Sequence, residues 1–328
     1  MSAHVPVLAR EATDALAPRE GGLYVDATYG AGGYTSLLLG AGGRVIAFDR
    51  DESAVANAGP REGLSVVRAP FDRMEDELAT RSALPVDGVV FDLGVSSMQL
   101  DQGERGFSFL RDGPLDMRMG REGPSAADFL NHADEAEIAD VIYQYGEERR
   151  SRRLAAAILE ARAIEPLATT GQLASLAERV LGKREKIHPA TRMFQAVRIL
   201  INDELGQVVR GLICAERVLR AGGRLAVVTF HSLEDRLVKR FLRLASGQAE
   251  TRSRFEPEAD GEPATLRTVG KAGAPSEGEI ATNPRARSAR LRVAERTHVP
   301  IRTYAEDELR RLGAPPLVFS DLQRRWAA

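Results

Sequence analysis

The stretch VDGVVFDLGVSSMQLD, residues 86–101, decides how the rest of the chain is interpreted. It opens with an apolar, β-branched run that is typical of a buried strand. The run ends at Asp92 and is followed by glycine and serine, so polar groups lie at the carboxyl end of that strand. In an open α/β sheet, ligands bind at that edge. An irregular segment follows, with RGFSF at 105–109 and PLDMRM at 114–119, and such segments form either functional or plain solvated loops.

Strands and helices alternate along the first part of the chain. We expect strands at 23–28, 44–49, 64–70 and 86–91, and helices at 5–17, 36–40, 52–58 and 73–81. Alternation at this spacing predicts a parallel sheet with helices on its faces.

The pattern changes further along, where apolar residues recur at helical spacing from about residue 126 to 220. The last helix of this block is expected at 194–219, with part of it rejoining the sheet domain. Residues 246–284, rich in Gly, Pro, Glu and Ser, are expected to form a long loop. Later elements are strands at 223–230 and 288–297 and a helix at 233–245. An all-helical block therefore interrupts an α/β sheet between its fourth and fifth strands.

Composition narrows the class of protein. With 328 residues, 43% of them hydrophobic, the chain can bury a large core. No run of 18 apolar residues predicts a membrane span, and residues 1–6 lack the basic and apolar segments of a secretory signal. The single cysteine, Cys214, excludes an internal disulfide and a cysteine-based metal site. These features predict a cytoplasmic enzyme or binding protein, and we expect no metal site.

Charge is spread unevenly, although the net charge is only −2. Residues 1–110 have a net charge of −7, and residues 283–328 have a net charge of +5. The basic segment includes RARSARLR at 285–292, whose arginines suit bidentate phosphate contacts. A solvated strand face explains the same arginines equally well.

A nucleotide site is expected at the end of the first strand. The sequence DATYGAGG at 26–33 places three glycines in the first strand-to-helix turn, where a ligand can approach the backbone. Asp49, 16 residues after Gly33, can accept both hydroxyls of a ribose. This arrangement serves dinucleotides and S-adenosylmethionine alike. The lack of G-x-G-x-x-G spacing favours S-adenosylmethionine, as does Asp26, which can meet a cationic methionine moiety.

The same motifs occur in a known family. The chain resembles, nearly end to end, the RsmH (MraW) family of bacterial S-adenosylmethionine-dependent 16S rRNA cytosine-N4 methyltransferases. Tyr34, Met98 and Thr229 stand where the family usually has His, Pro and Ser, and none of these departures removes a carboxylate. The matching segments are HVPVL at 4–8, DATYGAGG at 26–33, FDRD at 48–51, DLGVSSMQLD at 92–101, RGFSF at 105–109, PLDMRM at 114–119, YGEE at 145–148, HPATRMFQA at 188–196, FHSLEDR at 230–236 and NPRARS at 283–288.

The resemblance implies an α/β fold in which an all-helical substrate-recognition domain interrupts a Rossmann-like class I methyltransferase domain. The methyltransferase domain would comprise residues 1–108 and 206–328, and the helical RNA-recognition insert residues 109–205. Phe71 would cover the adenine, and Asp92 would lie under the sulfonium centre, where a negative charge is favourable. The residues implied to contact S-adenosylmethionine are Gly32, Gly33, Tyr34, Asp49, Phe71, Asp92 and Gln99.

The implied reaction needs acceptors for the protons of the cytosine amine, because the nitrogen lone pair is delocalised into the ring. The candidate catalytic residues are Asp92, Ser96 and His231. His231 is either a general base or a residue that orients its turn, since Ser232 and Asp235 resemble a helix-capping pair.

Other chemistry is limited by what the chain lacks. Cys214 is expected inside a helix as a small core residue, which leaves no nucleophile for C5 methylation of cytosine. DNA amino-methyltransferases carry two prolines and an aromatic residue after this acid, and this chain does not. A base would therefore stack on Phe107, Phe109 or Phe230, unless these rings belong to the core.

A stacked cytosine is out of reach, so the target base is expected to be flipped out or to lie in an irregular region. Candidates for binding the RNA backbone are the arginines of 149–153, Lys183 with Arg184, and the arginine run at 285–292, and each is otherwise a solvated face. His188 and Arg192 either face RNA or cap the helix after Pro189.

Taken together, the chain is predicted to be a cytoplasmic methyltransferase that modifies N4 of a cytidine in the decoding region of 16S rRNA. Its expected partner is 16S rRNA within the small ribosomal subunit, with no membrane partner and with a monomer and a homodimer both left open. One alternative is an amino-methyltransferase of DNA or of another nucleic acid. Another is a non-catalytic ribosome assembly factor that binds the cofactor. A nicotinamide-dependent oxidoreductase is disfavoured, because the dinucleotide spacing and a hydride-transfer site are lacking.

Overall fold

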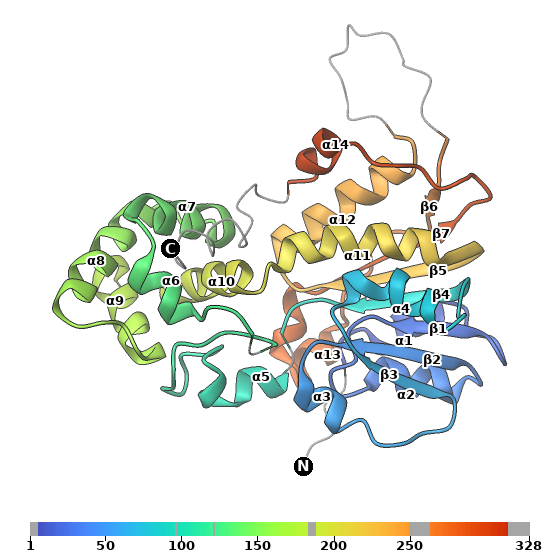
Figure 1. The fold of residues 1–328 in the computed structure, drawn as a ribbon, viewed down its shortest axis with the longest axis horizontal. Coiled ribbons are helices and arrows are strands. Elements are labelled where there is room, and N and C mark those ends of the chain that lie inside the picture. The colour runs from blue at the N-terminus through green and yellow to red at the C-terminus, as the bar shows by residue number, and fades with distance from the viewer. Residues whose placement is uncertain (1–5, 96, 121, 183–187, 249–262, 314–328) are drawn as a thin grey trace, which may run out of the picture. The chain divides into compact units, whose positions relative to one another are not determined.

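The computed structural model describes residues 6–95, 97–120, 122–182, 188–248 and 263–313 of the chain. The chain forms two compact units, one of residues 1–94 and 207–314, the other of residues 95–206. Figure 1 shows that the first unit contains the sheet and that the second is helical. Within the described ranges, no helix combines the length and the apolar character that a membrane span requires.

The first unit is built on a seven-stranded sheet with the order β3-β2-β1-β4-β5-β7-β6. The strands are β1 (Leu23–Asp26), β2 (Arg44–Asp49), β3 (Leu64–Arg68), β4 (Val86–Asp92), β5 (Leu219–Thr229), β6 (Leu266–Thr268) and β7 (Arg290–Arg296). Strands β1 to β5 pair in parallel, whereas β7 is antiparallel to both β5 and β6. The predicted Rossmann-like α/β class is confirmed, and the strand order reverses between β1 and β4, which is where such sheets bind ligands.

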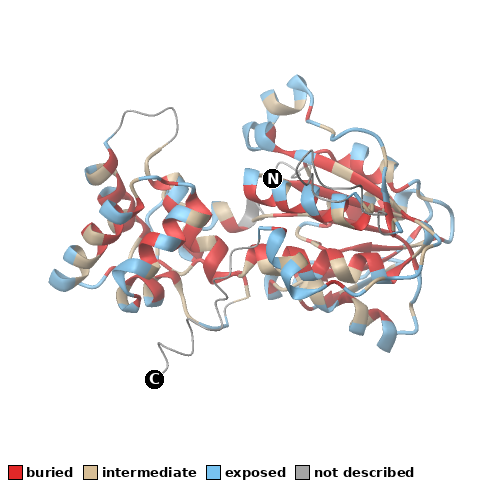
Figure 2. Cartoon of the chain, turned by 90° about the horizontal axis from the view of Figure 1, so that it is seen from above, coloured by how far each residue is buried: buried red, intermediate tan, exposed pale blue. Residues whose placement is uncertain are grey.

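Helices cover this sheet: α1 (Ala9–Ala15), α2 (Gly33–Gly40), α3 (Glu52–Ala56), α4 (Met74–Thr80), α11 (Glu204–Val218), α12 (Ser232–Ala245), α13 (Glu277–Thr282) and α14 (Glu306–Arg311), with short 3₁₀ turns η1 (Phe71–Arg73) and η3 (Pro284–Ser288). Helix α1 packs on α2, β5 and β7, and α12 packs on β5, β6 and β7. The apolar run of β4 is buried throughout, as a strand covered on both faces requires. Figure 2 shows the buried residues on the sheet and on the helix faces turned toward it.

The second unit contains α5 (Ser97–Asp101), η2 (Gly103–Arg105), α6 (Ala126–His132), α7 (Glu135–Gly146), α8 (Ser151–Ile164), α9 (Thr170–Leu181) and α10 (Ala190–Ile201). Helix α7 packs on α8 and α10, and α9 packs on the same two helices. This unit has a core of its own, in which Phe129, Ile142, Ile158, Leu173 and Val197 are fully buried. The expected helical block is therefore present.

Two expected elements are wrong. The single helix expected at 194–219 is broken into α10 and α11, because Asp203 adopts a left-handed φ of 46°. Beside the break, the Asn202 side chain accepts from the N–H of Met119 at 2.9 Å and donates to the carbonyl of Met117 at 2.7 Å. The loop expected at 246–284 contains β6 and α13, and β6 is held by its pairing with β7.

The helical unit begins earlier in the chain than the insert expected at 109–205. Residues 95–108 belong to it, and the guanidinium of buried Arg105 donates to the carbonyls of Arg118 and Met119 at 3.0 and 2.9 Å. These contacts tie the start of the unit to its interior. The recognition role assigned to the insert stays a prediction.

Candidate cofactor and catalytic site

The carboxyl ends of β1 and β4 lie side by side, because these strands pair in parallel with Asp26 opposite Val90. Just beyond the paired residues, the backbone N–H of Asp92 donates to Thr28 Oγ1 at 2.7 Å. The acids that end the two strands therefore lie at one edge of the sheet. This edge, at the reversal of strand order, is the expected ligand position.

Asp26 is fully buried, and its carboxylate is occupied by the turn that follows it. Oδ1 accepts from the N–H of Thr28 at 3.2 Å, and Oδ2 accepts from the N–H and hydroxyl of Thr35 at 3.2 and 2.6 Å. Burial raises the pKa of Asp26 to about 6, while these hydrogen bonds favour the charged form. Asp26 thus ties β1 to the start of α2, and its direct contact with a methionine moiety stays a prediction.

The three glycines of the turn differ in why a side chain is absent at each position. Gly30 and Gly32 adopt left-handed φ angles of 53° and 75°. A Cβ on Gly32 would lie 2.9 Å from the Tyr29 ring, and a Cβ on Gly33 would lie 2.3 Å from Pro6 Cγ. A Cβ on Gly30 would meet no atom closer than 3.9 Å. Open space therefore adjoins Gly30, which was not among the residues implied to contact the cofactor, whereas a side chain at Gly32 or Gly33 would clash with its neighbours.

Asp49 ends β2, next to the turn. Its Oδ2 accepts from the N–H of Gly30 and its Oδ1 from the N–H of Asp51, both at 2.8 Å. Burial raises the pKa of this carboxyl, and the two N–H groups oppose the rise. Each carboxylate oxygen keeps a further lone pair, so the group can still accept the two hydroxyls of a ribose.

Asp92 is the least compensated acid at this edge. Its Oδ1 is buried and has no hydrogen-bond partner within the described part of the chain. Burial raises the pKa of Asp92 well above its ordinary value, and the carboxylates of Asp26 and Glu234 raise it further. The Tyr34 hydroxyl opposes the rise, although its single O–H donates to the carbonyl of Val7. A positive charge placed here would stabilise ionised Asp92.

These groups fit S-adenosylmethionine. No ion pair with lysine or arginine is seen for Asp26 or Asp92 in the described ranges, so a cationic sulfonium would supply charge that the fold leaves out. Asp49 offers acceptors for the ribose. The fit rests on these two features, and the individual contacts stay predictions.

Phe71, the residue expected to cover the adenine, is packed between a strand and a helix. It begins η1 directly after β3, and its ring meets Phe91 of β4 edge-on with centroids 5.3 Å apart. A Cβ on Gly211 of α11 would lie 2.5 Å from Phe71 Cδ2. The ring is thus packed against both a strand and a helix, yet it remains partly exposed.

His231 acts as the N-cap of α12, and its capping partner is Glu234. The Glu234 N–H points to His231 Nδ1 at 3.4 Å, and the Glu234 carboxylate accepts from the N–H groups of Phe230 and His231 at 2.8 and 3.3 Å. The expected pairing of Ser232 with Asp235 is therefore wrong by one residue. Nδ1 is thus used by the cap, which makes His231 a residue that orients the turn, while Nε2 lies 3.1 Å from Glu234 Oε1 and the general-base role stays a prediction.

Glu234 is a residue that the sequence reasoning missed. Its side chain is buried, and its charge raises the pKa of Asp92. The signal was present, since Glu234 stands three residues after His231, at the spacing of a capping box.

The remaining candidates lie in the second unit. Gln99 of α5 and Phe107 are buried there, which favours a core role for Phe107. Phe109 stacks on His188 with ring centroids 4.4 Å apart. Ser96 lies outside the described residues.

Cys214 is a half-buried residue of α11, in line with its expected place inside a helix. Its Sγ donates to the carbonyl of Asp72 at 3.3 Å, and burial raises the pKa of the thiol to about 11. A thiol with so high a pKa is a poor nucleophile.

Comparison with known proteins adds to this geometry. The model of the MraW methylase family matches residues 1–297. A protein of Methylorubrum populi named ribosomal RNA small subunit methyltransferase H is 55% identical over 90% of this chain and 88% of its own length. The protein of that name from Caulobacter vibrioides is 53% identical over 91% of this chain and 97% of its own length. A solved rRNA methylase from Streptococcus thermophilus covers 90% of this chain and all of its own, with 12% identity and a TM-score of 0.42.

Proposed function

Because this chain belongs to the MraW methylase family, we propose that it transfers a methyl group from S-adenosylmethionine to the exocyclic N4 amine of a cytidine in the decoding region of 16S rRNA. The chain is a methyltransferase, and its relatives of more than half identity are named for small-subunit ribosomal RNA. The observation that carries the chemistry is the buried Oδ1 of Asp92, which has no hydrogen-bond partner among the described residues and lies where the strand order reverses.

The chain's own residues would bind the cofactor, orient Asp92 and accept a proton from the substrate amine. S-adenosylmethionine, when bound, supplies a methyl group on a positively charged sulfur. Asp49 would hold the ribose, Phe71 would cover the adenine, and Tyr34 would fix Asp92. Gly32, Gly33 and Gln99 complete the proposed cofactor residues.

Asp92 has the chemistry of a proton acceptor for the amine. As the N4–C bond forms and the C–S bond breaks, the nitrogen must lose one proton. The burial that raises the Asp92 pKa makes its ionised form a stronger base than an exposed carboxylate. Ser96 is proposed as a further acceptor, and His231 as the residue that orients the turn beside the site.

The proposal also covers how the substrate is recognised and where the enzyme acts. The helical insert at 109–205 would recognise RNA, and the assembled small subunit would supply part of the recognition, because the chain has a net charge of only −2. That substrate places the enzyme in the cytoplasm. A monomer and a homodimer are both compatible with this proposal.

The test is methyl transfer from labelled S-adenosylmethionine to small subunits isolated from a strain that lacks this protein, followed by nucleoside analysis. We expect label in N4-methylcytidine and a loss of at least about a hundredfold in rate for Asp92→Asn. The matched control is Asp76→Asn, which changes an exposed acid of α4 in the same unit.

Other outcomes would change the proposal. Label at another atom would overturn the amine chemistry but keep the cofactor. Faster transfer to free DNA than to the subunit would favour a DNA amino-methyltransferase. Cofactor binding without any transfer would favour an assembly factor.

A further inference from the structure

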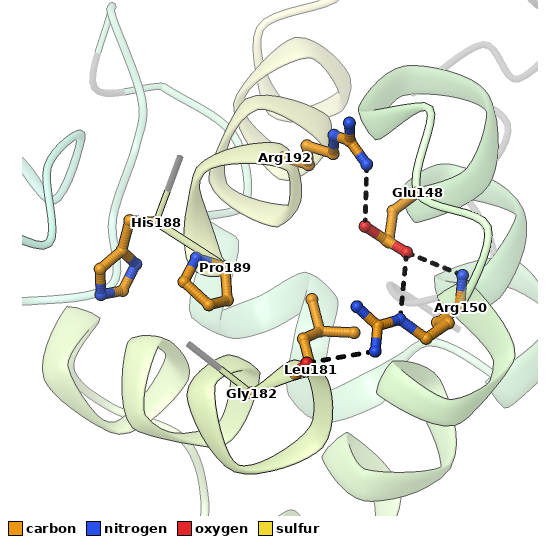
Figure 3. A pocket seen from close by; sticks show the side chains of 7 residues that line it. All are labelled: Glu148, Arg150, Leu181, Gly182, His188, Pro189 and Arg192. Atoms are coloured by element: carbon orange, nitrogen blue, oxygen red, sulfur yellow. Dashed lines mark hydrogen bonds and ion pairs between the residues drawn. The ribbon is translucent and has the colours of Figure 1, made fainter. Parts of the chain in front are cut away.

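A pocket lies wholly within the second unit, and none of the proposed cofactor or catalytic residues lines it. It is formed by Glu148 and Arg150 between α7 and α8, Leu181 and Gly182 at the end of α9, and His188, Pro189 and Arg192 at the start of α10 (Figure 3). The segment at 148–150 thus meets the end of α9 and the start of α10 around one hollow.

A buried carboxylate positions two arginines at this pocket. Glu148 is only 5% exposed, and its Oε1 accepts from the backbone N–H of Arg150 at 2.9 Å and lies 3.8 Å from Nε of the same residue, while its Oε2 accepts from Nη1 of Arg192 at 3.2 Å. Nη1 of Arg150 donates to the carbonyl of Leu181 at 3.1 Å. The dashed lines in Figure 3 follow these contacts. Both guanidinium groups are therefore held in place before any ligand arrives.

The arginines keep donors for a ligand. Their side chains are 40% and 44% exposed. Each guanidinium has five N–H groups, of which the described residues use one or two. Both oxygens of Glu148 are already engaged, so the pocket offers hydrogen-bond donors and hardly any acceptor. A ligand that only accepts, such as a phosphate, matches this surface.

Two helix ends add positive potential. Helices α8 and α10 have N-caps at Arg150 and Pro189, and neither carries an acidic residue in its first turn. The surrounding sequence agrees: residues 147–198 contain 11 Lys and Arg against 6 Asp and Glu, a net charge of +5. The rest of the second unit is acidic, with 4 Lys and Arg against 12 Asp and Glu. Positive charge is thus concentrated in this stretch of the sequence, although four of its charged residues, at 183–186, lie outside the described residues, and two of its arginines line the pocket.

His188 forms a wall of the pocket rather than a donor to a ligand. Its Nδ1 accepts from the N–H of Ala190 at 3.2 Å, and its Nε2 lies 2.8 Å from Glu178 Oε1. Its ring is stacked on Phe109. Of the two residues, His188 therefore accepts a hydrogen bond at the start of α10, whose N-cap is Pro189, and the Arg192 guanidinium keeps donors for a ligand.

We propose that this pocket is an anion site that holds a backbone phosphate of the RNA substrate. Arg150 and Arg192 donate to the phosphate, and Glu148 is the residue that positions them. The inference rests on the proposed function, which supplies RNA as the source of the phosphate, and it concerns a part of the chain outside the cofactor residues.

The test measures RNA affinity of the full chain against salt, by fluorescence anisotropy with an RNA oligonucleotide from the decoding region. For Arg192→Gln and Arg150→Gln we expect roughly tenfold weaker binding. The slope of log affinity against log salt should decrease by about 0.7 to 0.9 for each arginine. The control Arg179→Gln removes the same charge from an exposed position of α9 outside the pocket, and should change the affinity far less.

Two further measurements distinguish the loss of a phosphate contact from a general loss of RNA binding or of folding. Inorganic phosphate, compared with chloride at equal ionic strength, should compete with RNA in the wild type and much less in Arg192→Gln. Arg192→Lys retains the charge, so it should keep the salt slope and lose part of the affinity, and it serves as the test if the glutamine variants do not fold. S-adenosylmethionine affinity should be unchanged in each folded variant.

Folded variants that keep the affinity and slope of the wild type would overturn the phosphate site, as would an equal loss in Arg179→Gln. Loss of thermal stability with an unchanged salt slope would show that the cluster only joins helices. If the wild-type chain does not bind the oligonucleotide, the same variants are compared with small subunits as the RNA, and equal affinities there would overturn the phosphate site, whereas the proposed function is overturned only by the absence of methyl transfer to those subunits.

Discussion

Asp92 should make cofactor binding depend on pH. The pKa of Asp92 is raised, so at low pH its carboxyl is neutral and gives no negative charge to attract a sulfonium. As pH rises through that raised pKa, the carboxylate forms and attracts the cation. S-adenosylhomocysteine has a neutral sulfur, so its affinity should change less. We expect the affinity ratio of the two ligands to rise with pH, by up to about tenfold per unit, in calorimetric titrations.

The matched variant for this prediction is Asp92→Asn, which has no charge to gain. Its ratio of affinities should be flat across the same pH range. A ratio that stays flat in the wild type would contradict the placement of Asp92 beside the sulfonium. A slope that persists in Asp92→Asn would assign the effect to another acid, such as Asp26.

At the residue scale, the sequence could predict the acids that end strands, because a strand end and an acid are both local signals. Asp49 and Asp92 were found in this way. Glu234 and Pro6 were not, since their importance comes from contacts across the fold: Glu234 raises the pKa of Asp92, and Pro6 fills the space where a side chain at Gly33 would lie.

At the element scale, the close packing of α11 on Phe71 gives a prediction for Gly211. Alanine there raises helix propensity by up to about 1 kcal/mol, but its Cβ would lie 2.5 Å from the ring. We expect Gly211→Ala to displace Phe71 and to weaken S-adenosylmethionine binding roughly tenfold. Isothermal titration calorimetry would measure this affinity. The control is Gly40→Ala in α2, where a Cβ meets nothing within 4 Å. Unchanged affinity in Gly211→Ala would show that Phe71 does not contact the adenine.

The boundaries of elements were harder to predict than their types. Apolar periodicity runs through residues 194–219 without interruption, and so it hid the break at Asp203. That break depends on Asn202, whose hydrogen bonds to Met117 and Met119 join residues more than 80 positions apart in the sequence. Strand β6 was missed for a similar reason: its three residues are stabilised by pairing with β7 and not by a pattern of their own.

At the scale of the whole molecule, the chain separates two kinds of chemistry. The uncompensated acids lie in the unit that holds the sheet, and the arginine pocket lies in the helical unit. The arrangement follows from the topology, because an insertion after β4 leaves the parallel core of the sheet intact. Gln99 is the exception, a proposed cofactor residue that belongs to the helical unit.

This separation predicts that the two sites contribute independently to catalysis. Asp49→Ala should raise the KM for S-adenosylmethionine, and Arg192→Gln should raise the KM for RNA, because each variant removes contacts to one substrate. Free energies of substitutions without shared partners usually add, so with both substrates well below their KM the loss of rate in the double variant should equal the product of the single losses within about twofold. Steady-state kinetics with each substrate varied in turn would measure all four enzymes. A double variant that loses far less than the product would show that the helical unit and the sheet unit act as one coupled site.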